Sequence, residues 1–244
     1  MSVSPRRQAA VALVVALASL AGTRAASAQA QAAPRPSDQL TPAQFEALFR
    51  ARSDSARMYF TTADVHFMTG MIDHHAQALI MAAMAPTHGA SPAVRTLCER
   101  ILNAQQDEIV TMQQWLRERH QPVPEVDIRG LVVLLRFPGD TARMPGMSMG
   151  GGEQQMTMPG MLTPEQMAAL DRARGTEFDR LFLTGMIQHH GGAISMVRDL
   201  FATPGEGRDE LAFKLANDIQ VDQTTEIARM QLMLAALPLA GASR

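Results

Sequence analysis

The sequence lacks the residues that define several common classes of protein. Its 244 residues include one cysteine, one tryptophan and one tyrosine. A single cysteine excludes an internal disulfide framework and any zinc or iron–sulfur site built from cysteine alone. A formal net charge of −2 argues against a nucleic-acid partner, because nucleic-acid-binding modules are usually basic. Beyond the first thirty residues no apolar run reaches the length of a membrane span, so the mature chain is not expected to be membrane-embedded.

Methionine is unusually abundant, with 18 residues in the chain. Methionine is flexible and polarizable, and its thioether is a ligand for soft metal ions such as Cu(I). The hydrophobic fraction of 46% and the charged fraction of 19% are those of a globular protein. A methionine-rich, aromatic-poor globular chain favours helices and suggests a soft metal.

The first thirty residues have the pattern of a secretory signal peptide. Arg6 and Arg7 precede an apolar run over residues 9–21, and small residues follow with A-x-A sites that end at Ala28 and Ala30. We expect cleavage near Ala28 or Ala30 and a location in the periplasm or outside the cell. A retained membrane anchor is the alternative.

The rest of the chain is a tandem duplication. The heptapeptide at 69–75, Thr-Gly-Met-Ile-Asp-His-His, recurs at 184–190 as Thr-Gly-Met-Ile-Gln-His-His. A second block of spaced Ile, Gln, Glu, Ile and Met at 101–112 recurs at 219–230, and a Leu-Thr-Pro tripeptide precedes each copy. Three matched blocks in the same order indicate duplication and not chance.

Each copy is predicted to contain two long helices. The Thr-Pro pairs are helix-start signals, with threonine as N-cap and proline at the first helical position. The His-His motifs lie on helices expected at about 62–85 and 176–202, and the second helices are expected at about 92–119 and 208–237. Four such helices form either a bundle or a pair of packed helical hairpins.

The copies are separated by a linker that contains an apolar stretch, residues 130–137, compatible with a short strand. The expected organisation is a signal peptide at 1–30, repeat 1 at 38–120, a linker with a Met-rich tract at 121–161 and repeat 2 at 162–240.

The duplicated His-His motif is the first candidate metal site. On a helix the two histidines of each copy point 100° apart, and a methionine falls between them. Neutral imidazole together with thioether suits copper, and the sulfur favours Cu(I) over Cu(II). The candidate ligands are Met71, His74, His75, Met81, Met186, His189, His190 and Met196. The alternative is that these side chains only pack the helices and that the chain holds no metal.

The Met-rich tract is the second candidate. Its methionines stand among glycines and prolines that cannot form a core, whereas flexible thioethers can surround Cu(I) in a compartment where cysteine would be oxidised. The candidate ligands are Met144, Met147, Met149, Met156, Met158 and Met161. The alternatives are that the tract is a hydrophobic loop that binds a partner protein, or that it is a low-complexity segment whose methionines accumulated by drift.

Other duplicated residues have supporting roles. Glu108 and Glu226 recur with the same glutamine three residues before each, and they either cross-link the helices or orient the imidazoles by hydrogen bonds. Gly70 and Gly185 cost a helix interior about 1 kcal/mol each unless they allow another group to approach closely. We therefore expect close packing at both glycines.

These motifs resemble the bacterial domain of unknown function family 305. The resemblance rests on Gly-Met-Ile-x-His-His followed by Ala-x-x-Met, and on the downstream Gln-x-x-Glu-Ile-x-x-Met; it covers nearly the whole mature chain. It implies an exported, all-α, ferritin-like four-helix bundle built from two tandem helical hairpins. Some members of the family are associated with periplasmic copper binding and copper tolerance. Ferritin chemistry is not implied, because the chain has no Glu-x-x-His pair.

The expected function is non-catalytic capture and buffering of copper, with a copper-transfer protein as the partner that receives the ion. The sequence shows no paired carboxylates, nucleophile motif or cofactor-binding loop that would indicate an enzyme. One alternative is a helical structural or interaction protein of the cell envelope that holds no metal. A metal-dependent oxidoreductase is the less favoured alternative.

Overall fold

The computed structural model describes residues 40–56, 59–137, 158–203 and 209–238. The signal-peptide prediction and most of the Met-rich tract lie outside these ranges. The elements within them are α1 (Pro42–Ala56), α2 (Thr62–Ala83), α3 (Pro92–Glu118), β1 (Glu125–Arg129), β2 (Val132–Arg136), α4 (Pro164–Arg172), α5 (Thr176–Ala202) and α6 (Glu210–Ala236). The chain divides between Phe45 and Glu46 into two units, and everything below concerns the second.

The described fold is mostly helical, as the sequence predicts, and it also contains a small sheet. The two His-His helices are α2 and α5, and the second helix of each copy is α3 or α6, with ends within a few residues of those expected. Thr61 starts α2 with a reciprocal capping box to Asp64, and Thr163 starts α4 in the same way with Gln166. None of the described helices is long and apolar enough to cross a membrane.

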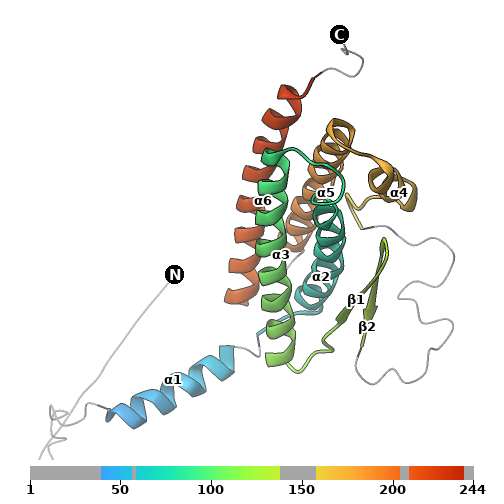
Figure 1. Ribbon diagram of the computed structural model, residues 1–244. Coiled ribbons are helices and arrows are strands. Elements are labelled where there is room, and N and C mark those ends of the chain that lie inside the picture. Colours follow the sequence, from blue (N-terminus) through green and yellow to red (C-terminus); the bar gives the residue numbers. More distant parts are fainter. Residues whose placement is uncertain (1–39, 57–58, 138–157, 204–208, 239–244) are drawn as a thin grey trace, which may run out of the picture. The chain divides into compact units, whose positions relative to one another are not determined.

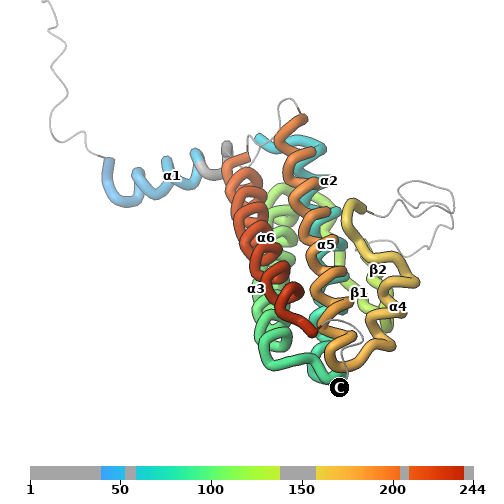
Figure 2. Tube along the Cα trace, turned by 90° about the horizontal axis from the view of Figure 1, so that it is seen from above, coloured from blue at the N-terminus to red at the C-terminus, as the bar shows by residue number. Residues whose placement is uncertain are grey.

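Packing joins the two copies through their His-His helices. Helix α2 packs on α3, α5 packs on α6, and α2 packs on α5. In both views α2 and α5 lie between α3 and α6 on one side and the sheet with α4 on the other (Figure 1, Figure 2). The His-His helices are therefore the inner pair, which explains why their motif residues are buried.

The sheet is an antiparallel hairpin in the linker. Its strand β2 corresponds to the expected strand at 130–137, whereas β1 was not predicted. Gly130 adopts a φ of 61° at the turn between them. The expectation of an all-α chain therefore missed this sheet. The hairpin is part of the fold, since its residues Val126 and Leu135 pack against the helical core.

A buried ion pair fixes α6 to the end of α3. Asp209 caps α6 by accepting a hydrogen bond from the Ala212 amide at 2.9 Å. The same carboxylate accepts from Trp115 Nε1 at 3.0 Å and from Arg119 Nε at 2.8 Å. Because the Arg119 guanidinium is paired with the Asp209 carboxylate, the burial of both charges is tolerated.

The linker returns to the helices at residues 158–162, directly over α2 and α5. Gln77 Nε2 donates to the Leu162 carbonyl at 3.0 Å, and the Leu162 amide donates to Gln77 Oε1 at 2.8 Å. On α5, a β-carbon added to Gly192 would lie 1.8 Å from the Pro159 carbonyl oxygen. Gly192 thus provides the space into which the linker backbone fits.

Two neighbouring glycines of α5 provide a matched test of this contact. Gly192→Ala is expected to lower the free energy of unfolding by about 1–3 kcal/mol, because the new methyl group overlaps the linker backbone. Gly191 has no atom within 4 Å of an added β-carbon. Gly191→Ala is therefore expected to raise the free energy of unfolding by about 0.5–1 kcal/mol through helix propensity. Urea unfolding measures both, and equal effects of the two variants would contradict the docked position of the linker.

Candidate metal centre

Four buried imidazoles form a continuous row across the α2–α5 interface. The rings of His74 and His189 are in contact, with centroids 3.8 Å apart. His75 extends the row on one side, 6.4 Å from His74, and His190 extends it on the other, 6.3 Å from His189. The two end pairs share an interplanar angle of 56°, so the duplication is preserved in the geometry of the side chains.

Each ring in the row has an oxygen acceptor at Nε2. His75 Nε2 lies 2.6 Å from Glu108 Oε2, and His190 Nε2 lies 2.7 Å from Glu226 Oε2. His189 Nε2 lies 2.9 Å from the backbone oxygen of His74. His74 Nε2 lies 3.0 Å from the carbonyl oxygen of Pro159 in the linker. The predicted support of the histidines by Glu108 and Glu226 is therefore present.

The acceptors determine the tautomer of the neutral rings. Because a carbonyl or ionised carboxylate can only accept, the proton of each ring belongs on Nε2, which leaves a lone pair on Nδ1. All four Nδ1 atoms are buried and have no hydrogen-bond partner among the described residues. A buried acceptor without a donor is unfavourable, and a metal ion would satisfy it. An imidazole that donates from its other nitrogen to a carboxylate or carbonyl is the usual arrangement of a metal-ligating histidine.

Burial keeps the two central imidazoles neutral. Desolvation lowers the pKa of His74 from its ordinary value of 6.5 to about 3, and the electrostatic interaction with the neighbouring His75 adds to this effect. The pKa of His189 is lowered well below its ordinary value, mainly by desolvation and next by His74. Both rings therefore keep a lone pair available for a metal in mildly acidic conditions.

The candidate methionines fall into two groups, one in each hydrophobic cluster of the core. Met71 lies in one buried cluster, against which Met196 packs, and Met81 and Met186 lie in the other. Each group thus combines a methionine of α2 with one of α5. On α2, Met71 comes about one turn before His74, and Met81 about two turns after it.

Gly70 and Gly185 lie against methionines of the opposite helix. A β-carbon on Gly70 would lie 3.4 Å from Met196 Cε, and one on Gly185 would lie 3.3 Å from Met81 Cε. The expected close approach is therefore observed at Gly185, where Leu162 Cδ2 would lie nearer still, at 3.0 Å. At Gly70 the distance is that of an ordinary contact.

The Met-rich tract is described only at its end. Met158 and Met161 are half-buried, whereas Met144, Met147, Met149 and Met156 lie outside the described residues. Met158 Sδ would lie 3.4 Å from a β-carbon on Gly70, at the same position as Met196 Cε. Of the predicted tract ligands, Met158 is thus placed beside the group of Met71 and Met196.

The geometry limits the ligand sets that are available. No three His, Cys, Asp or Glu side chains in the described ranges are placed to hold one metal ion. A metal site at the row would therefore need thioether sulfur beside one or two imidazoles. This donor set suits a soft ion and is a poor match for Mg²⁺ or Ca²⁺.

Two features of the site could not be found from sequence. The acceptor for His74 is a backbone carbonyl, at Pro159, and backbone atoms leave no signature in residue identity. The second feature is the burial of the Gln105 and Gln223 amides without partners among the described residues. The sequence shows that these glutamines are duplicated, but not that they are buried.

Comparison with known proteins assigns the family. The model of the family described as "Domain of unknown function (DUF305)" matches residues 64–234. This chain belongs to the DUF305 family. The match spans both His-His motifs and confirms the resemblance seen in the sequence. No match was found among curated proteins.

Solved DUF305 structures share the fold. A DUF305 fragment from Deinococcus radiodurans has a TM-score of 0.55 and 28% identity, covering 73% of this chain and 99% of that one. A putative secreted DUF305 protein from Streptomyces coelicolor has a TM-score of 0.53 and 26% identity, covering 71% and 92%. A structure described as CopM in the Cu(II)-bound form has a TM-score of 0.51 and 28% identity, covering 70% and 95%.

The lowered pKa values of His74 and His189 predict a stability that depends on pH. Between about pH 3 and pH 6.5 the unfolded chain binds protons that the folded chain excludes. The contribution of the neutral rings to the free energy of unfolding is therefore fully present above pH 6.5 and is lost as the pH decreases. In the metal-free protein the slope of the free energy of unfolding against pH is expected to reach up to about 1.4 kcal/mol per pH unit for each histidine.

Urea unfolding between pH 7 and pH 5 measures this slope. The double variant His74→Gln/His189→Gln keeps an amide donor near each Nε2 position but cannot titrate, so its slope should be smaller. His66→Gln changes an exposed histidine of α2 and should leave the slope unchanged. An unchanged slope in the double variant would contradict the assignment of neutral, buried rings.

Proposed function

We propose that this DUF305 protein is an exported binder of soft metal ions that captures and buffers copper as part of copper tolerance. In this proposal its four long helices form a ferritin-like four-helix bundle of two tandem hairpins. The protein acts by binding and release, without catalysis, and passes the ion to a copper-transfer partner. The observation that carries the proposal is the row of four buried imidazoles, in which no Nδ1 has a hydrogen-bond partner within the described part of the chain.

The hydrogen bonds of the row support ligation. A ligand nitrogen must be unprotonated and correctly oriented before the ion arrives. The bonds from His75 to Glu108 and from His190 to Glu226 orient the two end rings. A purely structural role would not require an uncompensated acceptor on all four rings.

The donor chemistry supports copper, with Cu(I) favoured over Cu(II). The candidate thioethers stand on the same two helices as the histidines, with Met71 and Met196 at one buried cluster and Met81 and Met186 in the other. Thioether prefers Cu(I), while imidazole accepts either oxidation state. The similarity to CopM, whose structure is described as Cu(II)-bound, supports copper as the metal.

The linker has a supporting role in this proposal. Its described end contributes the Pro159 carbonyl to His74 and brings Met158 to the group of Met71 and Met196. The remaining tract methionines, Met144, Met147, Met149 and Met156, would catch the ion and deliver it to this end.

Anaerobic titration of the mature chain with Cu(I), in competition with a chromogenic chelator, tests the proposal. The double variant His75→Gln/His190→Gln keeps a donor for Glu108 and Glu226 but has no Nδ1. We expect its Cu(I) affinity to fall by more than the roughly 10- to 100-fold that follows loss of an outer hydrogen-bond partner at metal sites. Met71→Leu/Met196→Leu removes thioether with little change in volume and should also weaken binding.

The control is the double variant His66→Gln/His120→Gln, which changes two exposed histidines. It should bind Cu(I) like the wild type. Far-ultraviolet circular dichroism establishes that all variants retain their helices. If folded wild-type protein fails to compete for Cu(I), or if only the control variant loses affinity, the row is not the metal site.

A further inference from the structure

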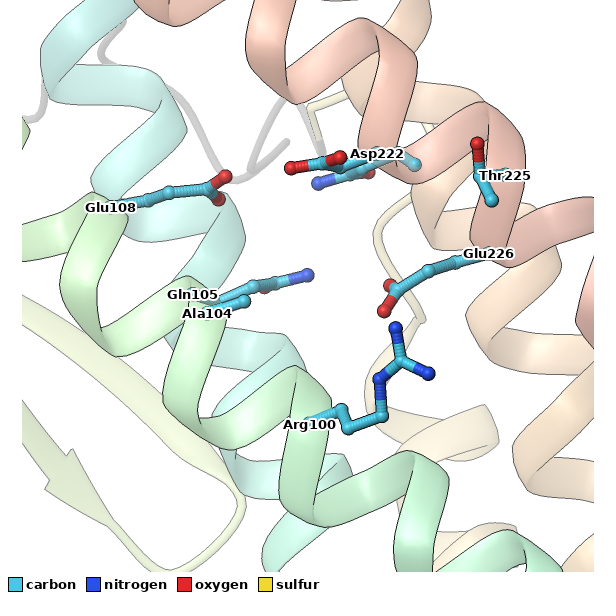
Figure 3. Close-up of a pocket in the computed structure, with 8 residues that line it drawn as sticks. Arg100, Ala104, Gln105, Glu108, Asp222, Thr225 and Glu226 are labelled. Carbon is cyan, nitrogen blue, oxygen red and sulfur yellow. The ribbon is translucent and has the colours of Figure 1, made fainter.

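An acidic cavity opens between α3 and α6, and the two carboxylates that bind the imidazole row, Glu108 and Glu226, belong to its lining. Its volume is about 170 Å³, enough for several water molecules. Glu108 and Gln105 extend into it from α3, and Asp222 and Glu226 extend into it from α6 (Figure 3). Arg100 is the one basic residue among the described residues that line it.

Two buried amides in the lining have no protein partner. Gln105 and Gln223 are each 3% exposed, and both amide atoms of each side chain lack a hydrogen bond within the described part of the chain. Four buried donor and acceptor atoms in one cavity require a polar occupant. This observation is independent of the acidic character of the lining.

The charges of the cavity favour a cation. Glu108, Asp222 and Glu226 contribute three carboxylates against the single guanidinium of Arg100. The pKa of Asp222 is raised first by desolvation and then by the charges of Glu108, Glu226 and Asp218. The carboxylates therefore repel one another, and a bound cation would relieve this repulsion.

We propose that this cavity binds a hydrated divalent cation of the hard, oxygen-preferring class, at a site separate from the Met/His row. The described carboxylates are not close enough for three of them to hold an ion directly. The cation therefore keeps much of its water shell, as Mg²⁺ commonly does, and its waters bond the carboxylates and the two glutamine amides. The inference does not depend on copper binding, because it uses oxygen donors and not the Nδ1 atoms or the thioethers.

The two copies differ at the position that makes this site. Asp222 corresponds to Ala104 at the offset that aligns Glu226 with Glu108, so the third carboxylate comes from the second copy alone. Asp222 is exposed at the mouth of the cavity, and its replacement is not expected to disturb folding.

Titration with Mn²⁺, followed by the electron paramagnetic resonance signal of the free ion, tests the proposal on the mature chain. Wild-type protein should bind one Mn²⁺ in the micromolar to millimolar range. Asp222→Asn should weaken binding about tenfold, the effect of one unit charge on a divalent ion across a water-separated contact. Gln105→Leu/Gln223→Leu should also weaken binding, because the amides can no longer bond the water shell.

The matched control is Asp107→Asn, which removes the same charge from an exposed residue of α3 outside the cavity lining. It should leave Mn²⁺ affinity within about twofold of wild type, as expected for a solvent-screened charge. Absence of Mn²⁺ binding, or binding that depends on His75 and His190 and not on Asp222, would overturn the proposal. Cu(I) titration of the same variants separates the two proposals, since Asp222→Asn should leave Cu(I) affinity unchanged.

Discussion

The contact of α2 with α5 at the His74–His189 pair determines the positions of the other candidate ligands. With these rings 3.8 Å apart, the helices are close enough for Met196 to reach Gly70 and for Met81 to reach Gly185. The same contact aligns the four imidazoles and directs the end rings toward the carboxylates of α3 and α6. A β-carbon at Gly185 would crowd Leu162 and Met81, which would lie 3.0 and 3.3 Å away.

The pair is not symmetric, and the asymmetry explains why the two copies diverged just after the His-His motif. His189 bonds the backbone oxygen of His74, whereas His74 bonds the linker at Pro159. Only one side of the interface can receive this linker segment. Gln77 holds the backbone of Leu162, and the aligned residue of the second copy, Gly192, makes room for the Pro159 carbonyl. The first repeat thus provides the hydrogen bonds that hold the linker, and the second repeat provides the space that it occupies.

Local sequence signals predicted the helices well because their ends have local causes. Capping residues such as Thr163 and the apolar spacing within each helix depend on neighbours a few residues away. The duplication likewise identified Glu108 and Glu226. Strand β1 was missed because it has only two apolar positions, and a strand of this kind depends on its partner. The pairing of His74 with His189 was also inaccessible, because periodicity gives directions on one helix and not the helix that faces it.

The central claim is that copper is bound by Nδ1 lone pairs of the imidazole row, one or two for each ion, together with thioether sulfur. Nitrogen-15 NMR of the histidine side chains tests it directly, because the chemical shift of each ring nitrogen reports protonation and metal coordination. The account predicts that His74, His75, His189 and His190 carry their proton on Nε2 in the metal-free protein. It predicts that Cu(I), which is diamagnetic, shifts Nδ1 resonances of this set and leaves exposed His66 and His120 unchanged. Protons on Nδ1, or Cu(I) shifts confined to His66 and His120, would contradict it.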